Sequence, residues 1–329
     1  MSTTSPPARR SWQSYFTPTV ARLAALVGLI ILFSIISPFF LTSNNLVNVM
    51  QNAVVVGMVA APLTLLLVAR QVDLSVGSAV AFAATIFTLT ARDTGLAIAI
   101  PAALGAAILV SLVNATAITR FRVNSIIATL GTLLIFRGLT KILGAGTNIS
   151  VDGFEFLGRT RFDVFGIDIP LSVLILAGVL VTFWFIMSWT RYGRHMIAMG
   201  ANPRASRLAG VNLERNVVKG FVLSGLVVGI ASLIVVSQLG ATSPTTAQGL
   251  EFLALTGVIL GGASLSGGRG TILGTTIAIL ILAVLDNGLT LARVSSFWQE
   301  VVRGALLVGA VALDQLRLAR RKTDVEFEL

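Results

Sequence analysis

Side chains that could carry acid–base, nucleophilic or metal chemistry are few in this sequence. It contains no cysteine and a single histidine, His195. That composition excludes disulfides, thiolate metal sites, a cysteine nucleophile and histidine clusters for metal binding. His195 lies between Arg194 and Met196 in the most basic stretch of the chain, where a solvated or helix-end role fits better than catalysis. We therefore expect neither a catalytic site nor a metal site.

The sequence also lacks the groups that would let it supply its own energy. No phosphate-binding loop of the form G-x-x-x-x-G-K-[ST] occurs, and the glycine-rich stretch 267–271 lacks the lysine and its spacing. Asp73, Glu251, Asp286 and Glu300 fall at the ends of apolar runs, whereas a proton-coupled carrier keeps titratable groups near the middle of the membrane. We expect the energy source to lie outside this polypeptide.

The composition sets the class of protein. Of the 329 residues, 55% are hydrophobic and only 12% are charged, and the mean hydropathy is +0.90, which is typical of a polytopic membrane protein. The net charge of +10 comes from basic residues scattered at the ends of apolar runs, without the interleaved aromatics of a nucleic-acid patch. Positive-inside topology explains them better, so we expect a lipid bilayer as partner and no nucleic acid.

The apolar runs predict an all-α polytopic protein with about ten transmembrane helices. The expected spans are 20–37, 46–69, one from the polar break at 70–77 to about 90, one from the turn at 92–95 to about 119, 125–143, 169–189, 217–239, 252–262, 271–291 and 298–316. The run 252–262 is too short to cross alone, so we expect broken or re-entrant helices near 70–77 and 252–270. Residues 20–316 then form one transmembrane domain between cytoplasmic tails at 1–19 and 317–329, because most basic residues fall on that side.

The longest hydrophilic interruption is the basic loop 190–216, which we expect to be cytoplasmic. Within it, Asn202-Pro203 is a helix start, since asparagine caps free amides and proline is tolerated at the first helical position. Ala205, Leu208 and Ala209 share one face of that short helix, and Gly210 is a plausible stop. Two interpretations stay open, an ordinary loop or a small helix that presses on a partner.

Polar residues inside other spans suggest a pathway or helix packing. Asn45, Asn48 and Asn52 share one helical face, which should look toward protein or a wet cavity because amides facing lipid are costly. Interhelical hydrogen bonding is the alternative. Asp73 could cap the helix that follows it. The GxxxG pairs at 225–229, 257–261 and 270–274 allow close approach of helices, within the protomer or in a dimer.

Several long phrases carry a family resemblance that covers nearly the whole chain. They are VDLSVGS at 72–78, IATLGTLLIFRGL at 127–139, YGRHMIAMGANPRASRLAGV at 192–211, VILGGASLSGGRGTILGT at 258–275, and DNGLTL with SSFWQEVVRG within 286–304. The chain thereby resembles permease subunits of bacterial ATP-binding-cassette importers of the ribose and branched-chain amino acid permease family, most closely the ribose and xylose branch. It departs from the family pattern at Arg70-Gln71, where a glycine pair is frequent, and at Asn124, where proline is frequent.

The resemblance implies partners and a docking site. A periplasmic sugar-binding protein would deliver substrate, a second permease protomer would complete a homodimer or heterodimer, and a cytoplasmic ATPase, commonly a fused double one, would bind ATP and Mg²⁺, so that this chain needs no cofactor. The short coupling helix that docks on the ATPase would comprise Gly200, Asn202, Pro203, Ala205, Ser206, Leu208, Ala209, Gly210 and Val211.

We therefore expect a non-enzymatic subunit of the bacterial inner membrane, with both termini cytoplasmic, that passes a monosaccharide inward by alternating access. Asn48, Asn52, Thr132 and Thr256 are the predicted lining of its path. The same machine could instead carry a polyol, a furanose signal, a nucleoside or a branched-chain amino acid. A stand-alone ion-coupled carrier is a second alternative, and an intramembrane enzyme, which would need a convergent nucleophile, base or metal set, is a third.

Overall fold

The computed structural model describes residues 13–164 and 167–327, so the predicted tail residues 1–12 and the last two residues lie outside it. Helices dominate this part of the chain. They are α1 (Gln13–Ile36), α2 (Ser43–Val68), α3 (Val76–Thr94), α4 (Leu96–Thr119), α5 (Ser125–Leu143), α6 (Phe156–Arg159), α7 (Leu171–Trp189), α8 (Arg191–Ala201), α9 (Pro203–Leu208), α10 (Leu213–Leu239), α11 (Leu250–Leu260), α12 (Ile272–Leu291) and α13 (Ser296–Phe327).

Eight helices in the described residues are long and apolar enough to cross a membrane, namely α1 from Thr19, α2, α4, α5, α7, α10, α12 and α13 to Leu316. The buried 19-residue helix α3 and the 11-residue helix α11 occupy the third and eighth predicted positions. The all-α polytopic class is thus confirmed. The turn predicted at 92–95 is a single residue, Gly95, because α3 continues to Thr94 and α4 begins at Leu96.

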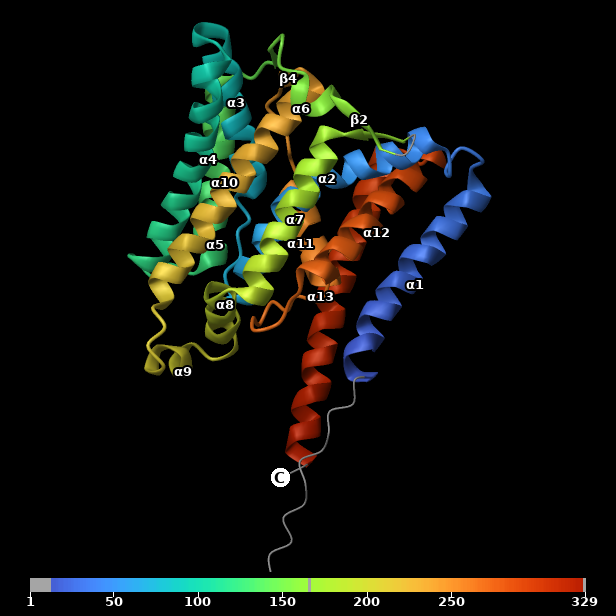
Figure 1. Cartoon of the computed structure of the whole chain (residues 1–329). Helices are drawn as coiled ribbons and strands as arrows, with labels where there is room; N and C mark the ends of the chain where they lie inside the picture. The colour runs from blue at the N-terminus through green and yellow to red at the C-terminus, as the bar shows by residue number, and fades with distance from the viewer. Residues whose placement is uncertain (1–12, 165–166, 328–329) are drawn as a thin grey trace, which may run out of the picture.

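Large buried side chains place the core around α2 and α10, against which α3, α4 and α12 pack. Met58 of α2 and Phe221 of α10 are fully buried. In contrast, α1 and α13 lie at one side of the bundle (Figure 1), and both are largely exposed along their spans. Exposed apolar side chains on these helices fit a lipid or protein neighbour rather than water.

The two ends of the bundle differ in structure (Figure 1). One end carries α6 and two small antiparallel sheets, in which β1 (Ile149–Ser150) pairs with β4 (Ala241–Thr242) and β2 (Arg161–Val164) pairs with β3 (Ile167–Pro170). The opposite end carries α8 and α9, together with the first residues of α1 and the last turns of α13. We call these the sheet end and the α9 end. The segment 317–327, predicted as a tail, continues α13 as helix.

The break between α2 and α3 has a defined backbone. Arg70 has a left-handed conformation, with φ 61°, and its N–H donates to the Leu67 carbonyl while the Gln71 N–H donates to the Leu66 carbonyl. This is the Schellman pattern, in which the left-handed position usually holds glycine. Asp73 does not cap α3 directly, because Ser75 occupies the cap position. The Asp73 carboxylate instead accepts hydrogen bonds from the Ser75 N–H at 3.0 Å and hydroxyl at 2.6 Å.

The irregular segment 261–271 between α11 and α12 is held from several sides. The Arg22 guanidinium of α1 donates to the Leu260 carbonyl at 3.0 Å. The Asp314 carboxylate of α13 accepts from the Ser264 hydroxyl at 3.0 Å and the Leu265 N–H at 3.3 Å. These contacts satisfy polar backbone that lipid could not, as an interrupted membrane helix requires.

Glycines of the predicted GxxxG pairs mediate packing inside the protomer. A Cβ added to Gly225 of α10 would lie 2.9 Å from the Ile108 Cα of α4, and one added to Gly229 would lie 3.1 Å from the Leu104 Cα. A Cβ on Gly261 would lie 2.6 Å from the Thr275 Cα of α12. These glycines therefore allow helices of the same chain to approach closely.

Candidate docking helix and cavities

The helix α9 is short, and both of its ends are capped by hydrogen bonds. The Asn202 side-chain oxygen accepts a hydrogen bond from the Ala205 N–H at 3.0 Å, and Pro203 takes the first helical position. At the other end Gly210 has φ 83°, and the Val211 N–H donates to the Ser206 carbonyl at 3.0 Å. The helix start and the stop at Gly210 predicted from the sequence are confirmed.

One face of α9 is presented to the surroundings. Leu208 is 91% exposed, and Ala205 and Ala209 are exposed beside it, whereas Ser206 is buried. A leucine so accessible at the tip of a loop contributes almost nothing to the stability of its own chain, so its apolar surface is available to a partner. The contact of this face with an ATPase stays a prediction.

The helix α8 fixes α9 to the bundle. Gly200 is buried and has no room for a side chain, since a Cβ there would collide with the Val68 carbonyl oxygen of α2. The Tyr192 hydroxyl donates to the Asn216 carbonyl at 2.9 Å, which ties α8 to α10. Burial raises the pKa of Tyr192 above its ordinary value, so the hydroxyl keeps its proton for this bond.

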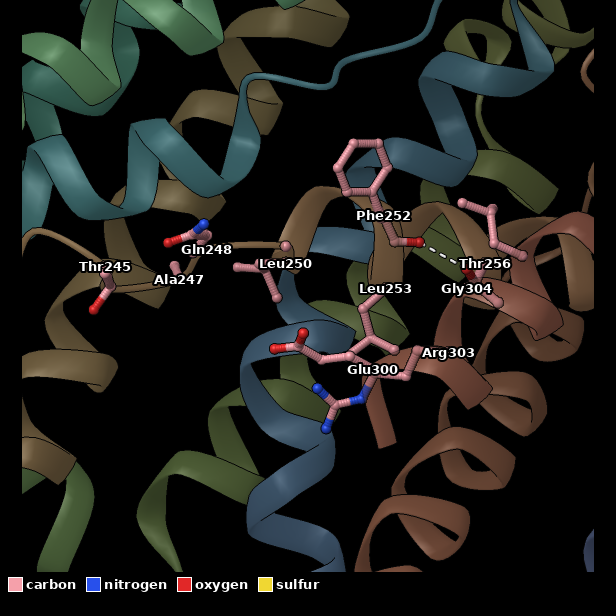
Figure 2. A pocket seen from close by; sticks show the side chains of 12 residues that line it. Thr245, Ala247, Gln248, Leu250, Phe252, Leu253, Thr256, Glu300, Arg303 and Gly304 are labelled. Carbon is pink, nitrogen blue, oxygen red and sulfur yellow. Dashed lines mark hydrogen bonds between the residues drawn. The ribbon is translucent and has the colours of Figure 1, made fainter. Parts of the chain in front are cut away.

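A cavity of about 740 Å³ lies between the start of α11 and the helix α13, and Figure 2 shows its lining. It is bounded by Thr245, Ala247, Gln248, Gly249, Leu250, Phe252, Leu253, Thr256, Glu300, Arg303, Gly304 and Leu307. This volume falls within the range of about 300–1,000 Å³ usual for small-molecule sites. The lining is mostly apolar, with aliphatic groups and the Phe252 ring, and five polar or charged side chains lie among these apolar groups. A few polar groups in an apolar lining are typical of small-molecule sites.

Among the four predicted path residues, Thr256 is part of this cavity lining. Its hydroxyl donates to the Phe252 carbonyl at 2.7 Å, the bond dashed in Figure 2. Sequence reasoning missed Gln248, Phe252 and Arg303. Arg303 forms paired hydrogen bonds with Asp286 of α12, both at 3.0 Å. The sequence signal of that pair was an acidic residue near the end of one predicted span and a basic residue 17 positions later, within the next span.

Asn48 and Asn52 lie in the part of α2 nearest the sheet end, and both are exposed. Asn52 borders a second cavity of about 480 Å³ with Gln51, Gly158, Arg159, Arg161 and Gln238. Their neighbour Asn45 is buried, and its amide exchanges two hydrogen bonds with Asn287 of α12, each 2.9 Å. The three asparagines therefore differ in environment: Asn45 joins α2 to α12, whereas Asn48 and Asn52 are exposed.

Thr132 belongs to a buried polar chain that crosses three elements. Its hydroxyl donates to the Asn114 side chain of α4 at 2.6 Å, and the Asn114 amide donates to the Ser75 hydroxyl at 2.7 Å. That hydroxyl in turn donates to Asp73. Thr132 is 5% exposed. Its hydroxyl thus links α5 to α4 and, through Asn114, to the α2–α3 break. That Thr132 lines the sugar path stays a prediction.

In the described residues, no group of three or more His, Cys, Asp or Glu side chains could hold a metal ion.

The helices, the exposed α9 and the polar cavities agree with a transport protein. A family model described as "Branched-chain amino acid transport system / permease component" matches residues 45–311. The chain belongs to this family. It is a transport permease and not an enzyme.

Curated relatives align along almost the full length. The chain is 34% identical to the ribose import permease protein RbsC of Escherichia coli (strain K12), over 95% of this chain and 99% of that protein. It is 36% identical to RbsC of Bacillus subtilis (strain 168), over 93% and 96%. It is also 34% identical to the L-arabinose transport system permease protein AraH of E. coli (strain K12), over 95% and 94%.

Proposed function

We propose that this chain is the membrane subunit of an ATP-binding-cassette importer that moves a monosaccharide inward through alternating access. The observation that carries the proposal is α9, a helix with a cap at each end that holds Leu208 91% exposed outside the bundle. Relatives of the chain are named as a ribose import permease and an L-arabinose transport system permease, and both sugars are pentoses. We extend that substrate class to this chain.

In this proposal the α9 end faces the cytoplasm and the sheet end faces the periplasm of a bacterial inner membrane. The basic loop that contains α9 then obeys the positive-inside rule, and the described ends of α1 and α13 lie on the same side (Figure 1). A cytoplasmic ATPase, fused as a double subunit in its own chain, binds ATP and Mg²⁺ and contacts the docking segment. That segment comprises Gly200, Asn202, Pro203, Ala205, Ser206, Leu208, Ala209, Gly210 and Val211. A periplasmic sugar-binding protein docks at the sheet end.

The sugar path follows from the two cavities. We place the entrance at Asn52, which borders the cavity near the sheet end, and at the exposed Asn48 one turn before it. Thr256 and Gln248 line the cavity between α11 and α13. Because the outward side of α13 is largely exposed, a second protomer can close this cavity and complete the path. Alternating access then requires two arrangements of the broken elements, the α2–α3 break and the segment 261–271, whose populations the ATPase shifts.

Reconstitution tests the proposal directly. The permease is placed in liposomes with the binding protein and the ATPase encoded beside it, and uptake of labelled ribose, arabinose, xylose, a polyol, a nucleoside and leucine is measured with and without ATP. We expect ATP-dependent pentose uptake. ATP-independent uptake by the permease alone, driven by an ion gradient, would contradict it in favour of a stand-alone carrier.

A substitution on α9 tests the ATPase assignment. Ala205 is exposed, so Ala205→Glu should leave the permease folded in the membrane but place a charge against the ATPase and abolish uptake. Thr94→Glu is the control for ATPase binding, because Thr94 is also exposed and is the last residue of α3, which ends at the sheet end. Normal uptake by the Ala205→Glu protein would remove α9 from the coupling mechanism.

A further inference from the structure

Three segments that are far apart in the sequence meet where α9 joins the bundle. The segments are the end of α2, the end of α8 and the irregular segment before α12. We call their meeting residues the junction cluster, which comprises Val68, Arg70, Gly200, Ala201, Gly267 and Gly268. The Gly268 N–H donates to the Val68 carbonyl at 2.7 Å. A Cβ on Gly268 would lie 2.9 Å from the Ala201 Cα. Backbone thus packs on backbone with no space between.

Arg70 is the side chain that fastens this cluster. Its Nε donates to the Gly200 carbonyl at 2.6 Å and its Nη2 donates to the Ala201 carbonyl at 3.2 Å. These are the last carbonyls of α8, which have no partner within their own helix. A cation is also favoured at the negative end of a helix dipole. The next residue along, Asn202, caps α9, so the guanidinium binds the base of the docking helix.

The backbone of Arg70 makes this arrangement informative. Its left-handed φ of 61° is a conformation that costs an arginine free energy and costs a glycine none. Gly267 packs so closely on the Arg70 side chain that a Cβ there would collide with the Arg70 Cγ. Arg70 is exposed, yet its guanidinium is hydrogen-bonded and its stem packs on Gly267. A strained backbone that holds a bonded side chain is expected where the side chain serves a purpose.

We propose that Arg70 is a positioning residue that transmits the displacement of α9 to the α2–α3 break and the segment 261–271. This inference rests on the proposed function, because α9 must be the element that the ATPase moves. The coupling is mechanical. The guanidinium holds the α8–α9 junction to α2. The glycines of the junction cluster pack in direct contact with the neighbouring backbone, so a shift of α9 displaces Val68 and Gly268 together. The α2–α3 break and the segment 261–271 then change conformation together.

Arg70→Gly separates a coupling role from a folding role. Glycine adopts φ 61° without strain, and this gain offsets the two lost hydrogen bonds. The variant permease should therefore unfold close to the wild-type temperature and should still bind the ATPase. In the reconstituted transporter we expect the maximal rate of ATP-driven sugar uptake to fall about ten-fold, within the usual range of coupling between two sites. The sugar concentration for half-maximal uptake should stay constant, and more ATP should be hydrolysed per sugar moved.

Arg122→Gly is the matched control. Like Arg70, Arg122 is an exposed, left-handed arginine at the α9 end, with φ 56°. Within the described residues its side chain donates no hydrogen bond to α8 or α9, whereas that of Arg70 donates two. It should transport at the wild-type rate. Arg70→Lys keeps the charge and one donor direction, so it should recover part of the lost rate.

The outcomes decide between the alternatives. Wild-type maximal uptake by the Arg70→Gly protein would overturn the inference. If that variant does not assemble, Arg70→Lys decides, since a reduced maximal rate in an assembled transporter supports the role and a normal rate refutes it. Absence of ATP-driven uptake in both the wild type and the Arg122→Gly protein would instead contradict the proposed function, and the two failures are thereby distinguished.

Discussion

Truncation of Leu208 to alanine tests whether α9 docks on an ATPase. Because Leu208 is 91% exposed, the permease alone should lose almost no stability, within the roughly ±0.5 kcal/mol typical of surface substitutions. Alanine also preserves the helix, since it has the highest helix propensity. If the leucine enters an apolar groove of the ATPase, its truncation removes about 2 kcal/mol of burial free energy. That loss corresponds to about a 30-fold weaker complex.

The assay measures ATPase affinity for the detergent-solubilised permease, with thermal unfolding of the permease recorded in parallel. Leu134→Ala, at a 71% exposed leucine on the spanning helix α5, is the matched control and should leave the affinity unchanged. Equal affinities for the wild type and the Leu208→Ala protein would refute the docking argument. A lower unfolding temperature for the Leu208→Ala permease alone would show that the exposed side chain has a partner within its own chain.

Other substitutions probe the helix cap, the buried amides and the path. Asn202→Ala should destabilise α9 locally by about 1 kcal/mol and reduce uptake several-fold, while the unfolding temperature of the bundle stays constant. Asn45→Leu should cost about 1–3 kcal/mol in the free energy of unfolding, because it leaves the buried Asn287 amide unpaired; the double change to leucine should restore part of this loss, and an equal loss in the double variant would contradict the pairing. Asn48→Leu and Asn52→Leu should lower uptake without changing the unfolding temperature, since both side chains are exposed, whereas failed assembly would assign them to packing.

The departures from the family pattern have local explanations in the structure. Arg70 occupies a left-handed position at the end of α2, which is where a glycine would fit without strain. Asn124 caps α5 through its side-chain oxygen, which accepts from the Ile126 N–H at 2.9 Å. A proline at that position would satisfy the backbone angle but supply no such acceptor. At both turns the side chain of this protein makes a hydrogen bond that glycine or proline could not make.

The sequence alone determined the class of protein, the approximate helices and the capped α9. These features depend on interactions that are local along the chain. A run of apolar residues fixes a span because lipid offers the backbone no hydrogen bonds, and the Asn202-Pro203 start fixes a helix end because the capping oxygen bonds an amide three residues away. Such signals can be read without knowledge of any other segment.

Only the tertiary structure decided which polar residues meet. Asn45 and Asn287 pair across 242 positions, and Arg70 reaches Gly200 across 130. The cavity between α11 and α13 likewise forms from residues that no spacing connects. Hydropathy determines that a helix lies in the membrane but leaves its rotation about its own axis open, because lipid solvates every apolar face alike. That rotation is set by close packing and by the cost of leaving a buried amide or carbonyl unpaired, which depend on all the helices at once.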